Sequence, residues 1–205
     1  MSALTSLGVT AERRLARAQH IAAVAADLFY RYGIHVVGVD QIAAKAEITK
    51  KTLYRYYRSK DLLVEAALRQ PLGLRFPRDG SPTERVIGAF RAMGEYLVDH
   101  EFRGCPFINA AAELANRRHP ARSVLVEATT QRRRWFTGRA FEEGLDDPEL
   151  IGEQLDVLFD GALANAMKRA DMTPVRAATL AAERLFSTTG TVHRTNRTSA
   201  LDRSA

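Results

Sequence analysis

Cationic and hydroxyl side chains crowd the stretch between Thr49 and Lys60. At about 100° per residue, Lys51, Thr52 and Arg55 would fall within roughly a third of a turn of one another on a helix. Lysine and arginine supply charge for phosphates and forked donors for guanine edges, threonine can meet a base or a phosphate, and tyrosine hydroxyls reach backbone oxygens. The stretch therefore predicts a DNA-reading helix. Its predicted DNA-binding residues are Thr49, Lys50, Lys51, Thr52, Tyr54, Arg55, Tyr56 and Lys60.

Two short amphipathic helices and a tight turn are predicted to position these side chains. Apolar residues repeat at helical spacing over residues 39–46, which favours a helix with one face in a core. Thr49 can cap the next helix through its hydroxyl, and Leu53 and Tyr57 lie four residues apart and point inward together. Ser59 is the predicted cap of a third helix, at whose N-terminus a backbone phosphate could sit. This order is a helix-turn-helix pattern.

Four segments of the chain resemble the DNA-binding domain of the TetR/AcrR family of bacterial one-component regulators. They read A-A-D-L-F-Y-R-Y-G at 25–33, V-D-Q-I-A-A-K-A at 39–46, T-K-K-T-L-Y-R-Y-Y at 49–57 and S-K-D-L-L at 59–63. The resemblance implies an N-terminal DNA-binding head, a C-terminal body that binds a small ligand, and a homodimer. Regulators of this family are most often repressors.

Three positions depart from the family pattern. Glu47 stands where the turn usually has glycine, Lys51 where the recognition helix usually has glycine, and Val37-Gly38 where Thr-Ser usually precedes the second helix. Lys51 places a long cation where the family often allows close approach to DNA. The operator sequence of a relative therefore does not transfer to this chain.

The positive charge of the chain is concentrated at its N-terminal end. Residues 1–70 carry 11 Lys and Arg against 6 Asp and Glu, whereas the remaining residues carry 19 against 18. Such asymmetry suits phosphate binding, because neutralised phosphates release counterions and provide most non-specific affinity. A merely soluble basic surface is the alternative, and the helix-turn-helix pattern beneath the charge disfavours it.

The hydrophobic periodicity predicts an all-α chain of about nine helices, without strand-like alternation or repeats. We expect residues 1–10 to form a mobile arm and a first helix to run from about residue 11 to Gly33. Further helices are predicted at about 61–70, 83–101, 107–116, 121–143, 148–170 and 174–187. The predicted domains are a TetR-type helix-turn-helix DNA-binding head at 11–57 and a ligand-binding and dimerisation body at 58–189, followed by a disordered tail at 190–205.

The composition predicts a cytoplasmic protein. No run of 18 apolar residues occurs, and the first ten residues lack the apolar region of a signal peptide. Cys105 is alone, which excludes an internal disulfide framework and fits a reducing compartment. Cys105 could sense oxidants if a cation such as Arg103 stabilised its thiolate, but a small packed residue is the favoured interpretation.

Aromatic and apolar side chains of the body could line a cavity for an effector. Few unpaired charges sit among them, so we infer an uncharged or aromatic, fairly hydrophobic effector, with Asn109 and Tyr96 as candidates for orienting hydrogen bonds. Ordinary core packing is the alternative for each residue. The predicted ligand-binding residues are Phe90, Met93, Tyr96, Leu97, Phe107, Ile108, Trp135, Phe136, Phe159 and Leu163.

Small residues recur in the eighth and ninth predicted helices, where they permit close helix approach. The family resemblance implies that these two helices pair with their copies, so that a two-fold dimer reads a palindromic operator on double-stranded DNA. Alanine is also simply a good helix former. The predicted dimer-interface residues are Gly161, Ala162, Asn165, Ala178, Ala181 and Ala182.

Two functions remain after enzymes are set aside. The five histidines show no metal-like pairing and no G-x-S-x-G or Walker pattern occurs, so we predict no catalytic residue, metal or cofactor. The favoured function is a transcriptional regulator, a repressor that a small effector releases from its operator. The alternative is a helical small-molecule or partner-binding protein whose basic head attaches loosely to nucleic acid or a membrane surface. Sequence-selective DNA binding distinguishes the two.

Overall fold

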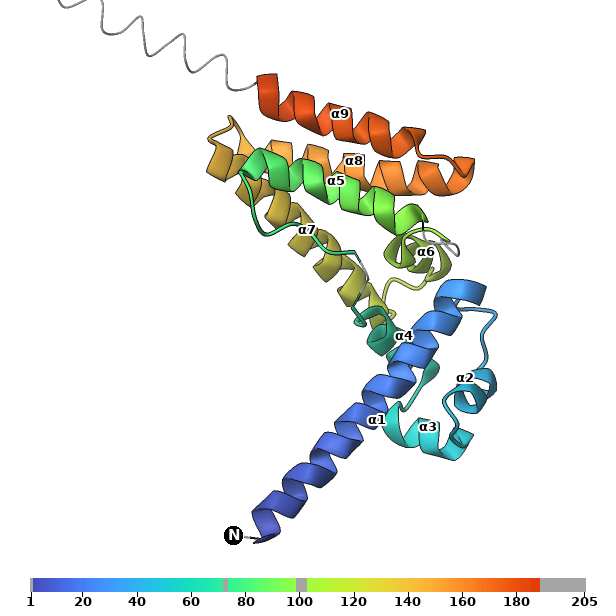
Figure 1. The fold of residues 1–205 in the computed structure, drawn as a ribbon. Helices are drawn as coiled ribbons and strands as arrows, with labels where there is room; N and C mark the ends of the chain where they lie inside the picture. The colour runs from blue at the N-terminus through green and yellow to red at the C-terminus, as the bar shows by residue number, and fades with distance from the viewer. Residues whose placement is uncertain (1, 72–73, 99–102, 189–205) are drawn as a thin grey trace, which may run out of the picture. The chain divides into compact units, whose positions relative to one another are not determined.

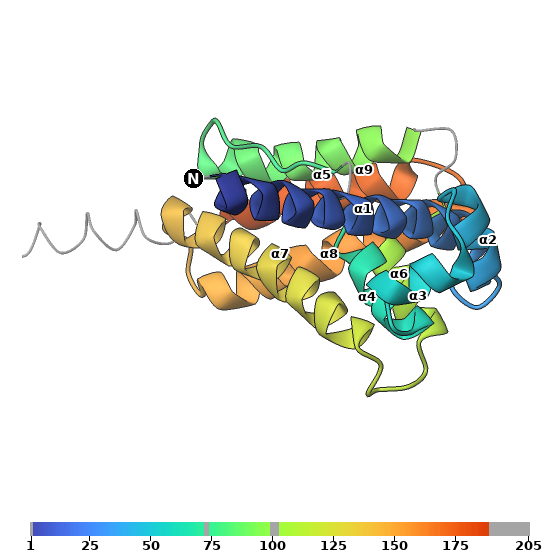
Figure 2. The same ribbon diagram turned by 90° about the horizontal axis from the view of Figure 1, so that it is seen from below.

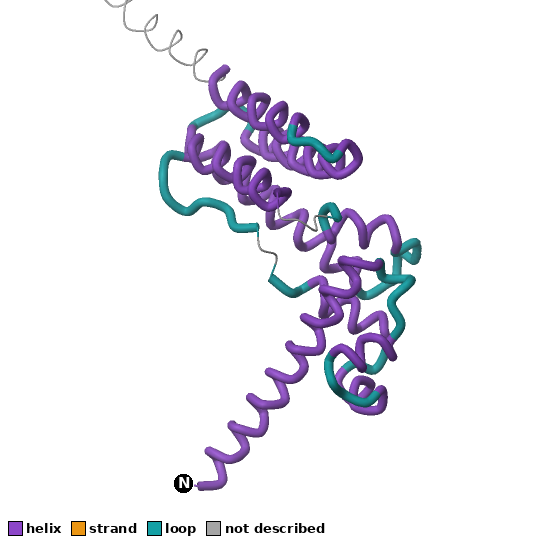
Figure 3. Tube along the Cα trace, turned by 45° about the vertical axis from the view of Figure 1, so that its right-hand side comes forward, coloured by secondary structure: helices purple, strands orange, loops and turns teal. Residues whose placement is uncertain are grey.

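A computed structural model describes residues 2–71, 74–98 and 103–188, with the side chains of residues 2–10 and 188 left aside. Within these ranges the chain forms nine α-helices and no strand, which confirms the all-α class (Figures 1 and 3). The helices are α1 Ser2–Tyr32, α2 Val39–Lys45, α3 Lys50–Tyr56, α4 Lys60–Leu68, α5 Pro82–Val98, α6 Pro106–Glu113, α7 Ala121–Glu143, α8 Pro148–Arg169 and α9 Thr173–Thr188. None of these helices is long and apolar enough to cross a membrane.

The N-terminal boundary of α1 differs from the sequence prediction. The helix begins at Ser2 rather than at about residue 11, so residues 2–10 are helical. Once the packed part of a helix has formed, each further residue adds a hydrogen bond at small cost, and no proline interrupts this stretch. The predicted tail at 190–205 lies outside the described residues.

The described residues fall into two units. The first unit comprises Met1–Pro71 and Pro106–Val126, and the second comprises Leu72–Cys105 and Glu127–Ala205. The division falls within α7, so that helix contributes to both units. The predicted head at 11–57 lies entirely in the first unit, which also contains α4, α6 and the start of α7.

A single apolar core holds the first unit together. Leu28 of α1, Leu53 of α3 and Leu63 of α4 are buried in it, because each stands on the apolar stripe of its helix. Figure 2 shows α2, α3 and α4 grouped along α1. Ala110 of α6 and Leu125 of α7 pack into the same core. The compact unit that carries the helix-turn-helix is therefore larger than the sequence pattern indicates.

The second unit packs α5, α8 and α9 together with the later part of α7. Its largest fully buried side chains include Phe90 of α5, Phe136 of α7 and Phe159 of α8. The approach of α7 to α8 is close at Gly152, where a Cβ atom would lie 2.9 Å from the backbone nitrogen of Thr137. Only glycine therefore fits this crossing without displacement.

A capping box begins α5. Glu84 N–H donates to Ser81 Oγ at 3.2 Å, and Ser81 N–H donates to Glu84 Oε2 at 2.8 Å. These reciprocal bonds satisfy two backbone donors that the helix itself leaves unpaired. The hydrogen bonds from the Ser81 backbone and hydroxyl hold the pKa of Glu84 below its usual value. The box fixes where the chain enters α5.

Candidate nucleic-acid interface and effector site

The turn between α2 and α3 closes through backbone hydrogen bonds. Glu47 N–H donates to the Ala44 carbonyl at 3.1 Å, and Ile48 N–H donates to the Ala43 carbonyl at 3.0 Å. Glu47 adopts φ 53°, a left-handed conformation that side chains other than glycine adopt at a cost. Arg17 of α1 donates to the Glu47 carbonyl at 3.4 Å. The turn thus keeps the geometry of a glycine turn although its residue is glutamate.

The inner face of α3 fixes its orientation against α1. Thr49 caps the helix, since its Oγ1 accepts from Thr52 N–H at 3.1 Å. Leu53 is fully buried, and Tyr57 Oη donates to the Ala18 carbonyl at 2.8 Å. Burial raises the pKa of Tyr57, so this phenol stays protonated and keeps donating. The recognition helix is therefore held at both its ends.

The outer face of α3 presents the predicted DNA-binding cations. Lys50, Lys51 and Arg55 are exposed, and Lys51 forms no hydrogen bond or ion pair with any described residue. Lys50 Nζ donates to Asp40 Oδ2 of α2 at 3.0 Å, and this bond raises the pKa of Lys50. Tyr54 is also exposed. The solvent-exposed face of α3 therefore carries three cations and a phenol.

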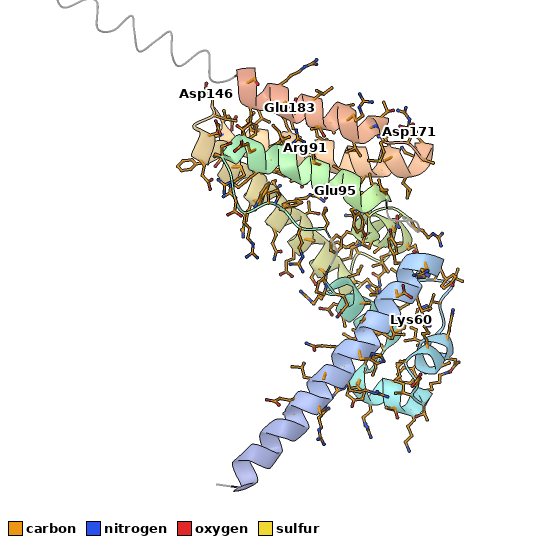
Figure 4. All side chains as sticks on the ribbon, viewed as in Figure 1. Lys60, Arg91, Glu95, Asp146, Asp171 and Glu183 are labelled. Carbon is orange, nitrogen blue, oxygen red and sulfur yellow. The ribbon has the colours of Figure 1, made fainter. Side chains whose placement is uncertain are left out.

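Three further predicted residues are less exposed. The Thr52 and Thr49 hydroxyls lie 3.0 Å apart, so Thr52 would exchange this bond for one to DNA. Tyr56 packs against the core of the first unit, with Arg55 Cζ 5.9 Å from its ring centroid. Lys60 is the first residue of α4, and its Nζ lies 5.9 Å from the Phe29 ring centroid of α1 (Figure 4). Because lysine is flexible, Lys60 can keep its stem on that ring while its ammonium group meets a phosphate.

Two long-range contacts join the end of α6 and the loop before α7 to residues on either side of the helix-turn-helix. His35 N–H donates to Glu113 Oε2 at 3.0 Å, and His35 Nε2 lies 2.9 Å from the Glu113 carbonyl. His119 Nδ1 accepts from Ala121 N–H at 3.2 Å, and its Nε2 lies 3.4 Å from Asp61 Oδ1. The sequence carries no local signal for either contact, because the partners are far apart along the chain.

Comparison with known proteins also indicates a DNA-binding helix-turn-helix in this part of the chain. The family model of the tetR family of bacterial regulatory proteins matches residues 21–67. The HTH-type transcriptional repressor KstR2 of Mycobacterium tuberculosis is 28% identical over 137 residues, which make up 62% of this chain and 68% of that repressor. A TetR transcriptional regulator of Streptomyces avermitilis superposes with a TM-score of 0.72 at 28% identity, covering 82% of this chain and 98% of that one. SCO4454, a TetR-family regulator of Streptomyces coelicolor, gives 0.73 at 25% identity, covering 85% and 96%.

The chain carries the DNA-binding domain of TetR-family transcriptional regulators at residues 21–67 and has the fold of TetR-family proteins. The matched range runs from the second half of α1 almost to the end of α4 and includes every predicted DNA-binding residue.

The predicted effector-site residues of this TetR-family protein are divided between the two units. Phe107 and Ile108 lie on α6 in the first unit, and Phe107 packs against the core of that unit. The others lie in the second unit. Those that are buried are Phe90, Met93, Phe136, Phe159 and Leu163, and those that are half-buried are Tyr96, Leu97 and Trp135.

Five aromatic rings pack together in the second unit. We define this aromatic cluster as Phe76, Phe90, Trp135, Phe136 and Phe159. The sequence did not predict Phe76 as a member. Phe76 lies in the non-helical connector before α5, and its ring centroid is 4.7 Å from that of Trp135 and 5.6 Å from that of Phe159. Sequence analysis missed Phe76 because prolines and glycines around it break every periodic pattern.

A partly buried ion cluster borders these rings. Arg132 of α7 donates to Asp156 of α8, and its Nη2 lies 2.9 Å from Asp160 Oδ1. Arg132 Cζ also lies 5.2 Å from the Phe159 ring centroid. Burial lowers the pKa of Arg132, but the two carboxylates outweigh that effect and raise it, so the guanidinium stays charged. This ion cluster joins α7 to α8.

The small residues predicted at the dimer interface do not all face outward. Ala162, Ala178 and Ala182 are buried within the second unit, so they serve its internal packing. Asn165 is exposed, while Gly161 and Ala181 are half-buried. An apolar groove of about 760 Å³ opens beside them on α8 and α9. It is lined by Ile151, Glu153, Gln154, Val157, Leu158, Ala181, Arg184 and Leu185.

Cys105 is buried at the boundary before α6. Reaction with an oxidant requires access to the thiolate, so this burial favours the packed residue over the sensor.

Proposed function

We propose that this TetR-family protein is a repressor that binds a palindromic operator as a homodimer and leaves it when a small, hydrophobic or aromatic effector binds. The exposed outer face of α3 carries the proposal. Lys51 and Arg55 are exposed on a capped helix, and Leu53 on its opposite face is buried in the core. Phosphate contacts by the cations supply affinity, whereas contacts to base edges supply selectivity.

The homodimer is supported by the surface of α8 and α9. Val157 lines the apolar groove and is exposed, and Leu150 and Leu180 on the same two helices are also exposed. An exposed apolar groove of this kind is typical of an interaction site. Two copies related by a two-fold axis would place two recognition helices on successive half-sites of a palindrome.

The effector is supported by the aromatic cluster. Rings and aliphatic side chains dominate the second unit, and the charges beside them are paired with one another. A neutral compound with an aromatic portion fits this composition. Binding would favour a dimer whose heads no longer match two major grooves, and the effector's differential affinity for that state would drive release. We place this regulator in the cytoplasm, where it meets DNA.

Selection of genomic DNA fragments tests the proposal. Purified protein is incubated with fragmented DNA of its source bacterium at near-physiological salt, and the retained fragments are sequenced. We expect a recurring palindrome. Retention without a shared sequence, lost steeply as salt rises, would instead support the loosely attached helical binding protein.

A panel of compounds then tests the effector class. Neutral aromatic compounds should raise the melting temperature and release the selected DNA, because they bind the native protein. Release by small polar metabolites alone would contradict a hydrophobic or aromatic effector.

A further inference from the structure

We propose that the ring of Phe76 occupies the position that an aromatic ring of the effector takes up on binding, so that the effector binds by expelling Phe76 and freeing residues 74–79, which precede α5. This inference rests on the proposed effector site in the second unit. It names the ligand as a neutral compound with a phenyl-sized ring, and it names the segment that the ligand displaces.

Phe76 is surrounded by rings from helices, although it is not itself in a helix. Its centroid lies 4.7 Å from that of Trp135, 5.9 Å from that of Phe136 and 5.6 Å from that of Phe159. The plane of the Phe76 ring is tilted by 56° to Trp135 and stands edge-on at 67° to Phe159. These are the separations and tilts that aromatic pairs favour. The surrounding rings therefore form a preformed site for one more ring.

Side-chain packing holds residues 74–79 of the connector in place. Within the described part of the chain, residues 74–79 form no hydrogen bond. Pro77 packs on α5, where its Cγ lies 2.7 Å from the position of a Cβ on Gly88, and Phe76 is the other attachment. Arg75 and Arg78 beside them are exposed. Phe76 is thus the member of the aromatic cluster that can leave without breaking a helix.

The charges around the aromatic cluster point to a neutral ligand. Arg132 is paired with Asp156 and Asp160, and Arg139 donates to Glu142. An ionised effector would have to compete with the carboxylates that already pair with Arg132 and Arg139, and loss of the Arg132–Asp156 pair would leave the buried Asp156 charge uncompensated. A neutral ring could bind without breaking any of these ion pairs.

Exchange of one ring for another preserves the packing of the second unit. An effector ring in place of Phe76 would keep the contacts to Trp135 and Phe159, so no cavity would open. The part of the effector outside its ring would make further contacts, and their binding free energy would drive the exchange. After the exchange, Pro77 would remain as the attachment of residues 74–79 to α5.

Toluene is a suitable probe for the site, because it is a neutral phenyl ring with one methyl group. Phe76→Ala removes the resident ring, and apolar cavities of that kind bind benzene-like molecules. Trp135 is the only tryptophan in the chain, so its fluorescence reports directly on the cluster. We expect toluene to bind Phe76→Ala saturably, with a changed Trp135 emission and a raised melting temperature, at a concentration about tenfold or more below that required by the wild type.

Phe141→Ala is the matched control. Phe141 lies on α7 like Trp135 and Phe136, but it is 75% exposed and belongs to no ring pair in the described structure. Its removal should leave the toluene affinity at the wild-type value. Phe76→Leu keeps an apolar side chain in the site and provides a second variant should Phe76→Ala fail to fold, with an expected affinity between those of the wild type and Phe76→Ala.

Trypsin digestion measures release of the connector. The cleavage sites at Arg75 and Arg78 flank Phe76, so expulsion of the ring should expose them further. We expect saturating toluene to accelerate cleavage there in the wild type, and Phe76→Ala to be cleaved rapidly without toluene. The inference is overturned if neither Phe76 variant binds toluene better than the wild type, or if toluene saturates the wild type without changing cleavage.

The DNA-selection experiment separates this inference from the proposed function. If the wild type selects a palindrome but the Phe76 variants gain no affinity for toluene, only the ring exchange is wrong. If the wild type selects no sequence, the regulator proposal fails, and the toluene and trypsin results still decide whether Phe76 is exchangeable.

Discussion

At the scale of single residues, the turn before α3 shows a left-handed conformation at a residue that disfavours it. Glu47 stands where the resemblance to TetR regulators leads us to expect glycine, and the chain adopts φ 53° there. A left-handed conformation costs a non-glycine residue about 1–2 kcal/mol. The buried contacts of Ala46 and Leu53 on either side of the turn offset this cost.

Replacement of Glu47 should therefore distinguish the effect of backbone strain on stability from the effect of the side-chain charge. Glu47→Gly relieves the strain but adds freedom to the unfolded chain, so we expect a gain of up to about 1 kcal/mol in the free energy of unfolding. Glu47→Ala removes the same carboxylate and keeps the strain, and it should not show this gain. Urea denaturation of the three proteins measures the difference. Equal stability of the glycine and alanine variants would show that the turn is not strained.

The cations that we propose to contact DNA should divide into two classes. Lys51→Ala should change the preference among operator sequences, because Lys51 is exposed on the outer face of α3, the face proposed to meet base edges. Lys60→Ala should weaken binding to all sequences and reduce the slope of affinity against salt by about one unit, as loss of a phosphate contact does. Lys168→Ala removes the same charge from the second unit and is the control. Competition binding on operator variants over a salt series measures all three, and a uniform loss for Lys51→Ala and Lys60→Ala would contradict the division.

At the scale of elements, the close crossing of α7 and α8 sets the geometry of the second unit. A Cβ on Gly152 would lie 2.1 Å from Thr137 Oγ1, whereas nothing lies within 4 Å of a Cβ on Gly138. Both glycines are helical, so they differ in their surroundings and not in their backbone conformation.

Alanine at these two positions should have opposite effects. Gly152→Ala forces α7 and α8 apart and should lower the free energy of unfolding by about 1–3 kcal/mol, the usual cost of overpacking. Gly138→Ala should raise it by about 0.5–1 kcal/mol, because alanine favours the helix and meets no neighbour. Denaturant unfolding of both variants measures the effects. A neutral Gly152→Ala would mean that the two helices can slide apart at no cost.

The capping box of α5 should make stability depend on pH. Because hydrogen bonds from Ser81 lower the pKa of Glu84 in the folded chain, their stabilising contribution is present above the unfolded pKa and is lost as pH falls through the folded pKa. We expect Glu84→Gln to melt below the wild type at neutral pH and to converge with it in acid. Glu95→Gln, on the same helix but outside the box, is the control. A wild-type advantage that persists below the folded pKa would exclude the carboxylate as its source.

At the scale of the whole molecule, sequence patterns predicted the head more completely than the body. The helix-turn-helix follows from local capping and periodicity, and Thr49 and Ser59 cap their helices as predicted. The place of Phe76 in the aromatic cluster depends on a non-helical connector with no period, and the bonds from Glu113 and His119 join distant segments. Local rules cannot predict such contacts, because they arise only when the chain has folded.

Exposure also corrects the description of the proposed dimer surface, since a stripe of small residues does not reveal which side of a helix faces outward. Val157 lines the apolar groove on α8 and is 64% exposed, and Val126 on α7 is equally exposed at 65% but lies outside the groove.

If the groove face joins two copies, Val157→Asp should convert the dimer to monomer, because a carboxylate buried at an apolar interface without a partner is strongly unfavourable. Val126→Asp makes the same change on the first unit and should leave the dimer intact. Sedimentation equilibrium measures both states, and a monomer bearing one recognition helix should lose most of its affinity for the palindrome while keeping its weaker affinity for a single half-site. Persistence of the Val157→Asp dimer would place the interface elsewhere, and a monomeric variant with full operator affinity would show that the two half-sites are not read together.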